Sequence, residues 1–201
     1  MNFKTMRVGL GLLVLIGLVG ILVLVFQRPA TLYGGVLDPA LPATNFSLTR
    51  NDGSKFELNK YRGKIILLFF GYTSCPDVCP VTMAELHQAI SKLDKEGAAQ
   101  VKVVFIAVDP ERDTPERIQE YANHFSPDFI GLSGSLEELK TVWDAYGVYR
   151  EVEETDSALD YLVSHTARIY LIDKAGNLRL TYAFGTSPDD IAHDLKILVK
   201  E

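Results

Sequence analysis

The stretch Lys64-Ile-Ile-Leu-Leu-Phe-Phe-Gly-Tyr-Thr-Ser-Cys-Pro-Asp-Val-Cys-Pro80 joins a continuous apolar run to two cysteines. Its first nine residues have the length and composition of a strand that is buried on both faces. Pro80 is typical of the first turn of a helix, and apolar residues recur at helical spacing over 83–93. Because α/β sheets bind ligands in the crevice beyond the ends of their strands, we expect Cys75 and Cys79 to lie in such a crevice.

The remaining sequence alternates between patterns typical of strands and of helices. Apolar and polar residues alternate on both sides of Asn51-Asp52-Gly53-Ser54, which predicts a β-hairpin before the first buried strand. After the cysteines, strands are predicted at 101–108, 129–132, 166–172 and 178–182, and helices at 115–125, at 135–146 and from 188 onward. This order predicts one α/β domain with a mixed central sheet, helices on both faces and an antiparallel edge formed by the last two strands.

The N-terminal segment has a different character. Residues 8–26 are nineteen consecutive residues without a charge, and a helix of that length spans about 28 Å, close to the ~30 Å hydrocarbon core of a bilayer. A cleaved signal peptide usually has a shorter apolar region, of about 7–15 residues. We therefore predict a single transmembrane helix in an uncleaved anchor at 1–28. A Pro- and Gly-containing linker at 29–43 and the α/β domain at 44–201 follow.

Charge predicts the orientation of this anchor. Lys4 and Arg7 precede the apolar run and Arg28 alone follows it closely, so the N-terminus is expected in the cytoplasm and the domain on the extracytoplasmic, periplasmic side. Seven residues before the span are too few for a mitochondrial transit peptide, which favours a bacterial cell membrane. Beyond Arg28 the chain has 17 basic and 26 acidic residues, a formal charge of −9. This acidity argues against a nucleic-acid partner.

Cys75 and Cys79 are the only cysteines in the chain. A disulfide between them would close too short a loop to contribute much stability. At the start of a helix a thiolate is stabilised, and side chains four residues apart on a helix have Cβ atoms ~5–6 Å apart, so the pair could form a redox-active disulfide or chelate a soft metal. The Cys-x-x-Cys motif of thioredoxin-type oxidoreductases is one residue shorter. Zinc and iron–sulfur clusters normally take four protein ligands, which favours copper for a chain with two cysteines.

A third ligand would have to come from another part of the chain. His87, His124 and His193 lie on helical patterns and are interpreted as surface or packing residues. His165 stands in Tyr161-Leu-Val-Ser-His-Thr-Ala-Arg168, directly before an apolar strand, where a loop could reach the cysteine crevice. Its pattern alone leaves a functional role and a structural role equally open.

Three motifs together resemble the SCO/SenC family of copper proteins. They are Phe70-Gly-Tyr-Thr-Ser-Cys-Pro-Asp-Val-Cys-Pro80, Val108-Asp-Pro-Glu-Arg-Asp-Thr-Pro115 and Tyr161-Leu-Val-Ser-His-Thr166, and the resemblance covers nearly all of 40–200. It implies a thioredoxin-like fold, a membrane anchor and a role in assembling the binuclear copper centre of cytochrome c oxidase, by copper delivery or by reduction of that centre's cysteines. It also implies that Cys75, Cys79 and His165 are copper ligands.

The same resemblance places Asp109 and Asp113 near the site, where they would orient a ligand or contact a partner. For Asp113 the alternative is an ordinary turn or helix-cap carboxylate. Family members often carry Asp immediately before the ligand histidine, whereas this chain has Ser164. A carboxylate at this position could add a weak ligand or orient the imidazole, so the chain departs from the family pattern in the coordination of Cu(II).

Two functions remain open at the level of the sequence. The first is a copper-binding assembly factor whose partner is the copper-site subunit of cytochrome c oxidase or another copper chaperone. The second is an enzyme, a thiol–disulfide oxidoreductase that acts on cysteines of an extracytoplasmic cuproprotein. A peroxidase of the peroxiredoxin type is disfavoured, because it needs Thr three residues before its reactive Cys and Tyr72 occupies that position.

Overall fold

The computed structural model describes residues 16–18, 20, 31–155 and 160–201. The chain divides into two units, Met1–Thr31 and Leu32–Glu201. In the first unit, residues 16–18 and 20 are helical, and most of the predicted anchor lies outside the described residues. Within the described ranges, no helix combines the length and the apolar character needed to cross a membrane.

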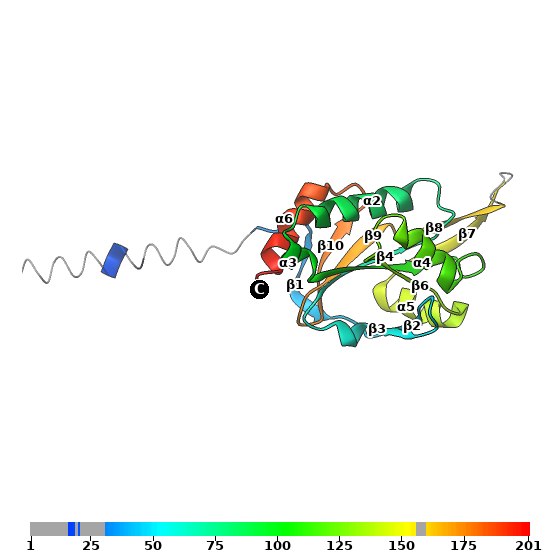
Figure 1. Ribbon diagram of the computed structural model, residues 1–201, viewed down its shortest axis with the longest axis horizontal. Coiled ribbons are helices and arrows are strands. Elements are labelled where there is room, and N and C mark those ends of the chain that lie inside the picture. Colours follow the sequence, from blue (N-terminus) through cyan, green and yellow to red (C-terminus); the bar gives the residue numbers. More distant parts are fainter. Residues whose placement is uncertain (1–15, 19, 21–30, 156–159) are drawn as a thin grey trace, which may run out of the picture. The chain divides into compact units, whose positions relative to one another are not determined.

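The centre of the second unit is a six-stranded sheet with the strand order β1-β10-β9-β4-β5-β6 (Figure 1). β4, β5 and β6 are parallel, whereas β9 is antiparallel to β4, β10 to β9 and β1 to β10. The mixed sheet predicted from the sequence is therefore confirmed. Its strands are β1 (Gly35–Pro42), β4 (Ile65–Gly71), β5 (Val101–Ala107), β6 (Ile130–Leu132), β9 (Arg168–Ile172) and β10 (Asn177–Ala183).

Helices cover both faces of this sheet, as predicted. α2 and α6 pack against one another on one face, and α5 lies on the opposite face with the β2–β3 hairpin (Figure 1). A second hairpin, β7–β8, forms its own two-stranded sheet and extends away from the central one (Figure 1). The bounds are β2 (Ser47–Thr49), β3 (Lys55–Glu57), η1 (Leu58–Tyr61), α2 (Val78–Ser91), α3 (Lys95–Ala98), α4 (Pro115–Asn123), α5 (Leu136–Tyr146), β7 (Arg150–Glu154), β8 (Tyr161–His165) and α6 (Pro188–Leu198).

Local sequence explains where the main elements begin and end. All seven residues of β4 are buried, as expected for a continuous apolar run between two layers. Thr114 caps α4 by accepting a hydrogen bond from the backbone N–H of Arg117. Gly131 in β6 lets α4 approach the sheet closely, because a Cβ atom there would lie 2.6 Å from backbone atoms of Ile118.

β1 corrects the expectation that 29–43 is a linker without regular structure. Residues 35–42 pair with β10, and β1 rather than the β9–β10 pair forms this edge of the sheet. The prolines of this segment suggested a linker, but proline is compatible with an edge strand because one side of that strand needs no hydrogen-bond donors. The antiparallel arrangement expected for the last two strands is confirmed, although they lie inside the sheet.

The β7–β8 hairpin is the second element that the sequence pattern did not predict. No strand was predicted between the helix at 135–146 and the strand at 166–172, yet residues 150–154 form β7, which pairs with β8 in a register that joins Arg150 to His165. Its charged residues do not alternate with apolar ones, because β7 is largely exposed to solvent and has no core face to fill. α2 also begins two residues before Pro80.

Candidate metal centre

The two cysteines lie where β4 passes into α2, at the carboxyl end of the central parallel strands. Cys79 is in the first turn of α2 and is fully buried, whereas Cys75 lies three residues before the helix and is half-buried. The expectation that both occupy one helical face is therefore wrong in detail. The backbone N–H of Cys79 instead points at the Sγ atom of Cys75, 3.4 Å away, so the helix N-terminus faces the Cys75 sulfur.

A glycine makes room for the buried sulfur. A Cβ atom on Gly71, the last residue of β4, would lie 2.7 Å from the Sγ atom of Cys79 and 2.7 Å from a ring carbon of Phe105. These separations are too short for a side chain, so Gly71 allows Cys79 to pack directly against the strand backbone.

His165 reaches the cysteines from the end of β8. Its Nε2 atom lies 3.6 Å from the Sγ atom of Cys79, and its ring packs edge-on against the ring of Tyr72 at a centroid distance of 5.9 Å. The Nδ1 atom lies 3.3 Å from the carbonyl oxygen of Thr166. A proton on Nδ1 would be donated to this carbonyl and would leave the Nε2 lone pair free to bind a metal held by the sulfurs, whereas a proton on Nε2 lets the ring donate to the Cys75 thiolate when no metal is bound.

The three side chains form one cluster. Single donor atoms from Cys75, Cys79 and His165 all lie within 4.8 Å of one another, and within the described part of the chain this is the one group of three or more such residues with that geometry. The other histidines lie elsewhere, in contact with Phe129 (His87), Glu120 (His124) and Asp194 (His193). Two thiolates and one imidazole are a donor set that fits Cu(I).

The two thiols differ in their ionisation. The pKa of Cys75 is lowered far below its usual value, first by a hydrogen bond from the Cys79 thiol and then by His165 and the backbone N–H groups of Asp77 and Cys79. The pKa of Cys79 is raised by the same hydrogen bond and by burial. The pair therefore shares one negative charge, which resides on the more exposed Cys75 and makes it the nucleophile of the two.

Asp113 supports the segment that leads to Cys75. Its carboxylate is 1% exposed and accepts hydrogen bonds from the backbone N–H of Thr73 at 3.0 Å and from the Thr73 hydroxyl at 2.6 Å. The guanidinium of Arg117 donates to the oxygen of the same hydroxyl at 2.9 Å and to Ser74 at 3.1 Å. Burial raises the pKa of Asp113 to about 6.

Asp109 faces the histidine side of the site. It is fully buried, forms an ion pair with Arg112 and accepts a hydrogen bond from the Tyr161 hydroxyl at 2.8 Å. Neither aspartate supplies a donor atom to the cluster. Their burial favours a role in holding the site over direct contact with a partner.

Several residues around the site were not singled out from the sequence. Thr73, Arg112 and Tyr161 belong to the quoted motifs, and their position there could have pointed to them, whereas Arg117 lies outside these motifs. The hydroxyl of Ser164 bonds across the hairpin to Glu153 and thus points along β7.

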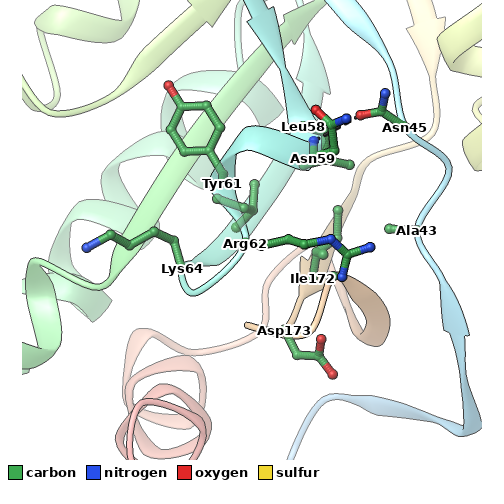
Figure 2. Close-up of a pocket in the computed structure, with 11 residues that line it drawn as sticks. Ala43, Asn45, Leu58, Asn59, Tyr61, Arg62, Lys64, Ile172 and Asp173 are labelled. Carbon is green, nitrogen blue, oxygen red and sulfur yellow. Dashed lines mark hydrogen bonds between the residues drawn. The ribbon is translucent and has the colours of Figure 1, made fainter.

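A separate pocket lies at the opposite end of β4, near Lys64. Figure 2 shows Arg62 and Asp173 among its lining residues, together with the hydrogen bond from the Asn59 backbone N–H to the Asn45 side chain at 2.9 Å. The cavity measures about 50 Å³, which admits one or a few water molecules and no organic ligand of ordinary size. It therefore does not compete with the cysteine cluster as the candidate site.

Comparison with protein families and curated relatives gives one consistent result. The family model described as SCO1/SenC matches residues 37–200. The chain is 42% identical over 147 residues to the mitochondrial protein SCO1 homolog 1 of Arabidopsis thaliana, a match that covers 73% of this chain but 43% of that relative's length. It is 35% identical over 153 residues to the SCO2-like protein RC0895 of Rickettsia conorii, covering 76% of this chain and 74% of the relative.

Solved structures resemble the second unit over nearly their whole length. The apo Sco1 protein from Thermus thermophilus has a TM-score of 0.76 at 39% identity, covering 84% of this chain and 97% of that one. Arabidopsis thaliana ScoI with copper bound has a TM-score of 0.73 at 37% identity and covers 79% and 98%. Bradyrhizobium japonicum ScoI with copper bound has a TM-score of 0.70 at 38% identity and covers 79% and 99%. These likenesses confirm the expected α/β, thioredoxin-like fold.

Proposed function

The chain belongs to the SCO1/SenC family, and from this premise we propose that Cys75, Cys79 and His165 together bind one copper ion. The observation that carries the proposal is the cluster of one imidazole nitrogen and two sulfurs within 4.8 Å. The two ScoI proteins described above, which were solved with copper bound, support the choice of metal.

The chemistry of the three donors suits a metal that is bound and then passed on. Cys75 already holds the negative charge of the thiol pair, and Cys79 releases its proton when its sulfur joins the metal. Three protein ligands leave copper accessible, so a thiolate or imidazole of a partner can replace them one at a time. Oxidation of both thiols to a disulfide removes two of the three ligands, which makes binding dependent on redox state.

In the cell, the bound copper is destined for the copper centre of cytochrome c oxidase. The partner is the copper-site subunit of that oxidase or another copper chaperone. Residues 1–28 anchor the chain in a bacterial cell membrane with the N-terminus in the cytoplasm, and residues 44–201 work on the periplasmic side. The nineteen uncharged residues at 8–26 and the basic residues before them support this placement.

A thiol–disulfide reductase is the second candidate, and the asymmetry of the thiols favours it. The Cys75 thiolate would attack a disulfide of a cuproprotein and form a mixed disulfide, releasing one substrate thiolate. The Cys79 thiolate would then attack the Cys75 sulfur and release the second substrate thiolate. The substrate gains two electrons and this chain is left with a Cys75–Cys79 disulfide.

Anaerobic copper titration of the reduced full chain, kept in solution with detergent, distinguishes these functions. We expect one copper per chain and an intense thiolate-to-Cu(II) band on oxidation of the metal. His165→Ala should lose stable copper binding while both thiols remain titratable, and His124→Ala, an exposed histidine bonded to its own helix, is the matched control. Unchanged copper affinity in His165→Ala would favour the reductase.

A further inference from the structure

The metal cluster is assembled from two separate parts of the fold. Cys75 and Cys79 belong to the β4–α2 connection, whereas His165 ends a hairpin that forms its own two-stranded sheet. The hydrogen bonds of the central sheet resume at Arg168, where β9 begins three residues after His165. The distance between the sulfurs and the imidazole therefore depends on this connection to β9 and on side chains that join the hairpin to the rest of the domain.

The loop at 108–113, which follows β5, contacts β8, the strand that carries His165. From this loop Arg112 donates a hydrogen bond to the carbonyl oxygen of Tyr161 at 3.1 Å, and its guanidinium lies 3.7 Å from the centroid of the Tyr161 ring. The Tyr161 hydroxyl returns to the loop and donates to Asp109 at 2.8 Å, and Asp109 in turn pairs with Arg112. The three side chains form a closed set of contacts, which we call the Arg112–Tyr161 clamp.

A second arginine, on the hairpin, donates hydrogen bonds to the loop. Arg150 lies on β7, and its guanidinium donates to the carbonyl oxygen of Val108 at 2.7 Å and to Glu111 at 3.1 Å. Thus the loop holds β8 through Arg112 while β7 holds the loop through Arg150. Opposed connections of this kind restrict both sliding and rotation of the hairpin.

The same loop also reaches the cysteine side of the site. Its last residue, Asp113, holds Thr73 two residues before Cys75. One short loop therefore contacts both halves of the candidate metal centre, and the clamp is the part of it that acts on the histidine half.

We propose that Arg112 and Tyr161 are positioning residues that hold the His165 imidazole against the copper bound by the cysteine pair. The inference rests on the proposed function. A planar guanidinium stacks on the ring and donates to the Tyr161 carbonyl at the same time, which a lysine ammonium cannot reproduce. When the clamp is lost, the hairpin moves and the imidazole spends less time on the metal.

The test measures copper affinity of the full chain in detergent by competition with a Cu(I) chelator, together with the electron paramagnetic resonance spectrum of the Cu(II) form. Arg112→Ala is expected to lower the affinity about 10–100-fold, as is usual for residues that orient a metal ligand, and to weaken the nitrogen coupling in the spectrum. Tyr161→Phe, which keeps the stacked ring and loses the bond to Asp109, should lose less. Arg179→Ala removes a distant, ion-paired arginine and should match the wild type.

A double-mutant comparison separates positioning from a general loss of stability. If Arg112 acts through His165, Arg112→Ala with His165→Ala should keep the same weak residual copper affinity of the two thiolates, read with a weaker Cu(I) chelator, as His165→Ala alone. The proposal is overturned if the losses of copper affinity caused by the two substitutions add in the double variant. It is also overturned if Arg112→Ala has the copper affinity and the spectrum of the wild type. Failure of the wild-type chain to bind copper is a different result, because it refutes the proposed function itself. If Arg112→Ala does not fold, the same comparison with Tyr161→Phe decides the question.

Discussion

Thr73 donates both its backbone N–H and its hydroxyl to the carboxylate of Asp113, at 3.0 and 2.6 Å. The Asp113 carboxylate, which holds the segment before Cys75, is buried away from water. Its hydrogen-bond donors are mainly neutral groups. Burial outweighs these hydrogen bonds, so the pKa of Asp113 rises to about 6. Burial of Asp113 beside the proposed metal site therefore disfavours the ionised form of its carboxylate.

This raised pKa predicts how stability depends on pH. Because the folded chain holds the Asp113 proton more tightly than the unfolded chain, whose pKa is about 3.9, the stabilisation is complete below about pH 4 and is lost as the pH rises through about 6. Relative to Asp113→Asn, the wild type should lose up to about 3 kcal/mol of unfolding free energy over that interval. Urea unfolding at a series of pH values measures this. A difference between the two chains that stays constant with pH would contradict it, and Asp144→Asn, at an exposed position, is the control.

Gly71→Ala is expected to damage the metal centre. The new Cβ would meet the Cys79 sulfur and Phe105 at 2.7 Å, so α2 or the sulfur must move away from β4. We expect at least a tenfold loss of copper affinity, measured by chelator competition, as for other displacements of a metal ligand. Gly131→Ala is the matched control, since its Cβ would clash with the backbone of α4 at 2.6 Å and destabilise the fold away from the sulfurs. Equal copper affinity in the two variants would sink this prediction.

The ionisation of the thiol pair can be read by alkylation. At about pH 5 iodoacetamide should label Cys75 and spare Cys79, because the thiolate is the reactive form and Cys75 holds the charge. Cys79→Ala removes the largest cause of the lowered pKa, so labelling of Cys75 should begin at a higher pH. Mass spectrometry of peptides locates the label. Equal labelling of both cysteines in the wild type at this pH would rule out the assigned asymmetry.

Asp194 should stabilise the start of the domain. This fully buried carboxylate accepts hydrogen bonds from the backbone N–H groups of Tyr33 and Gly34, at 3.0 and 2.9 Å, and from the Tyr182 hydroxyl at 3.2 Å. Asp194→Ala leaves these donors without an acceptor and should cost about 2–4 kcal/mol of unfolding free energy.

Urea unfolding gives that energy, and limited proteolysis near Tyr33 gives an independent measure of release. Asp189→Ala, on the same helix but exposed and paired with Lys92, should change stability by less than about 1 kcal/mol. A similar small effect in Asp194→Ala would show that the segment is held by other contacts.

The sequence predicted the parts of the fold where burial on both faces leaves a clear pattern. β4 is an uninterrupted apolar run, and the end of that run predicts that the two cysteines after it lie beyond the end of the strand. β1 escaped prediction because an edge strand tolerates proline, and β7 because an exposed strand has no apolar face to mark it. The pattern alone did not decide whether His165 has a functional role. Its side chain lies close to Cys79 only because of where the whole β7–β8 hairpin is placed, and the two residues are 86 positions apart in the chain.

The bonds of Asp194 also decide where a mechanical load enters the domain. A pull on the N-terminal segment reaches Tyr33 and Gly34 before it reaches β1, which begins at Gly35. The carboxylate of Asp194 on α6 therefore binds the chain directly ahead of the β1–β10 pairing. If residues 1–28 anchor the chain as proposed above, a pull from the membrane would meet these hydrogen bonds before the β1–β10 pairing.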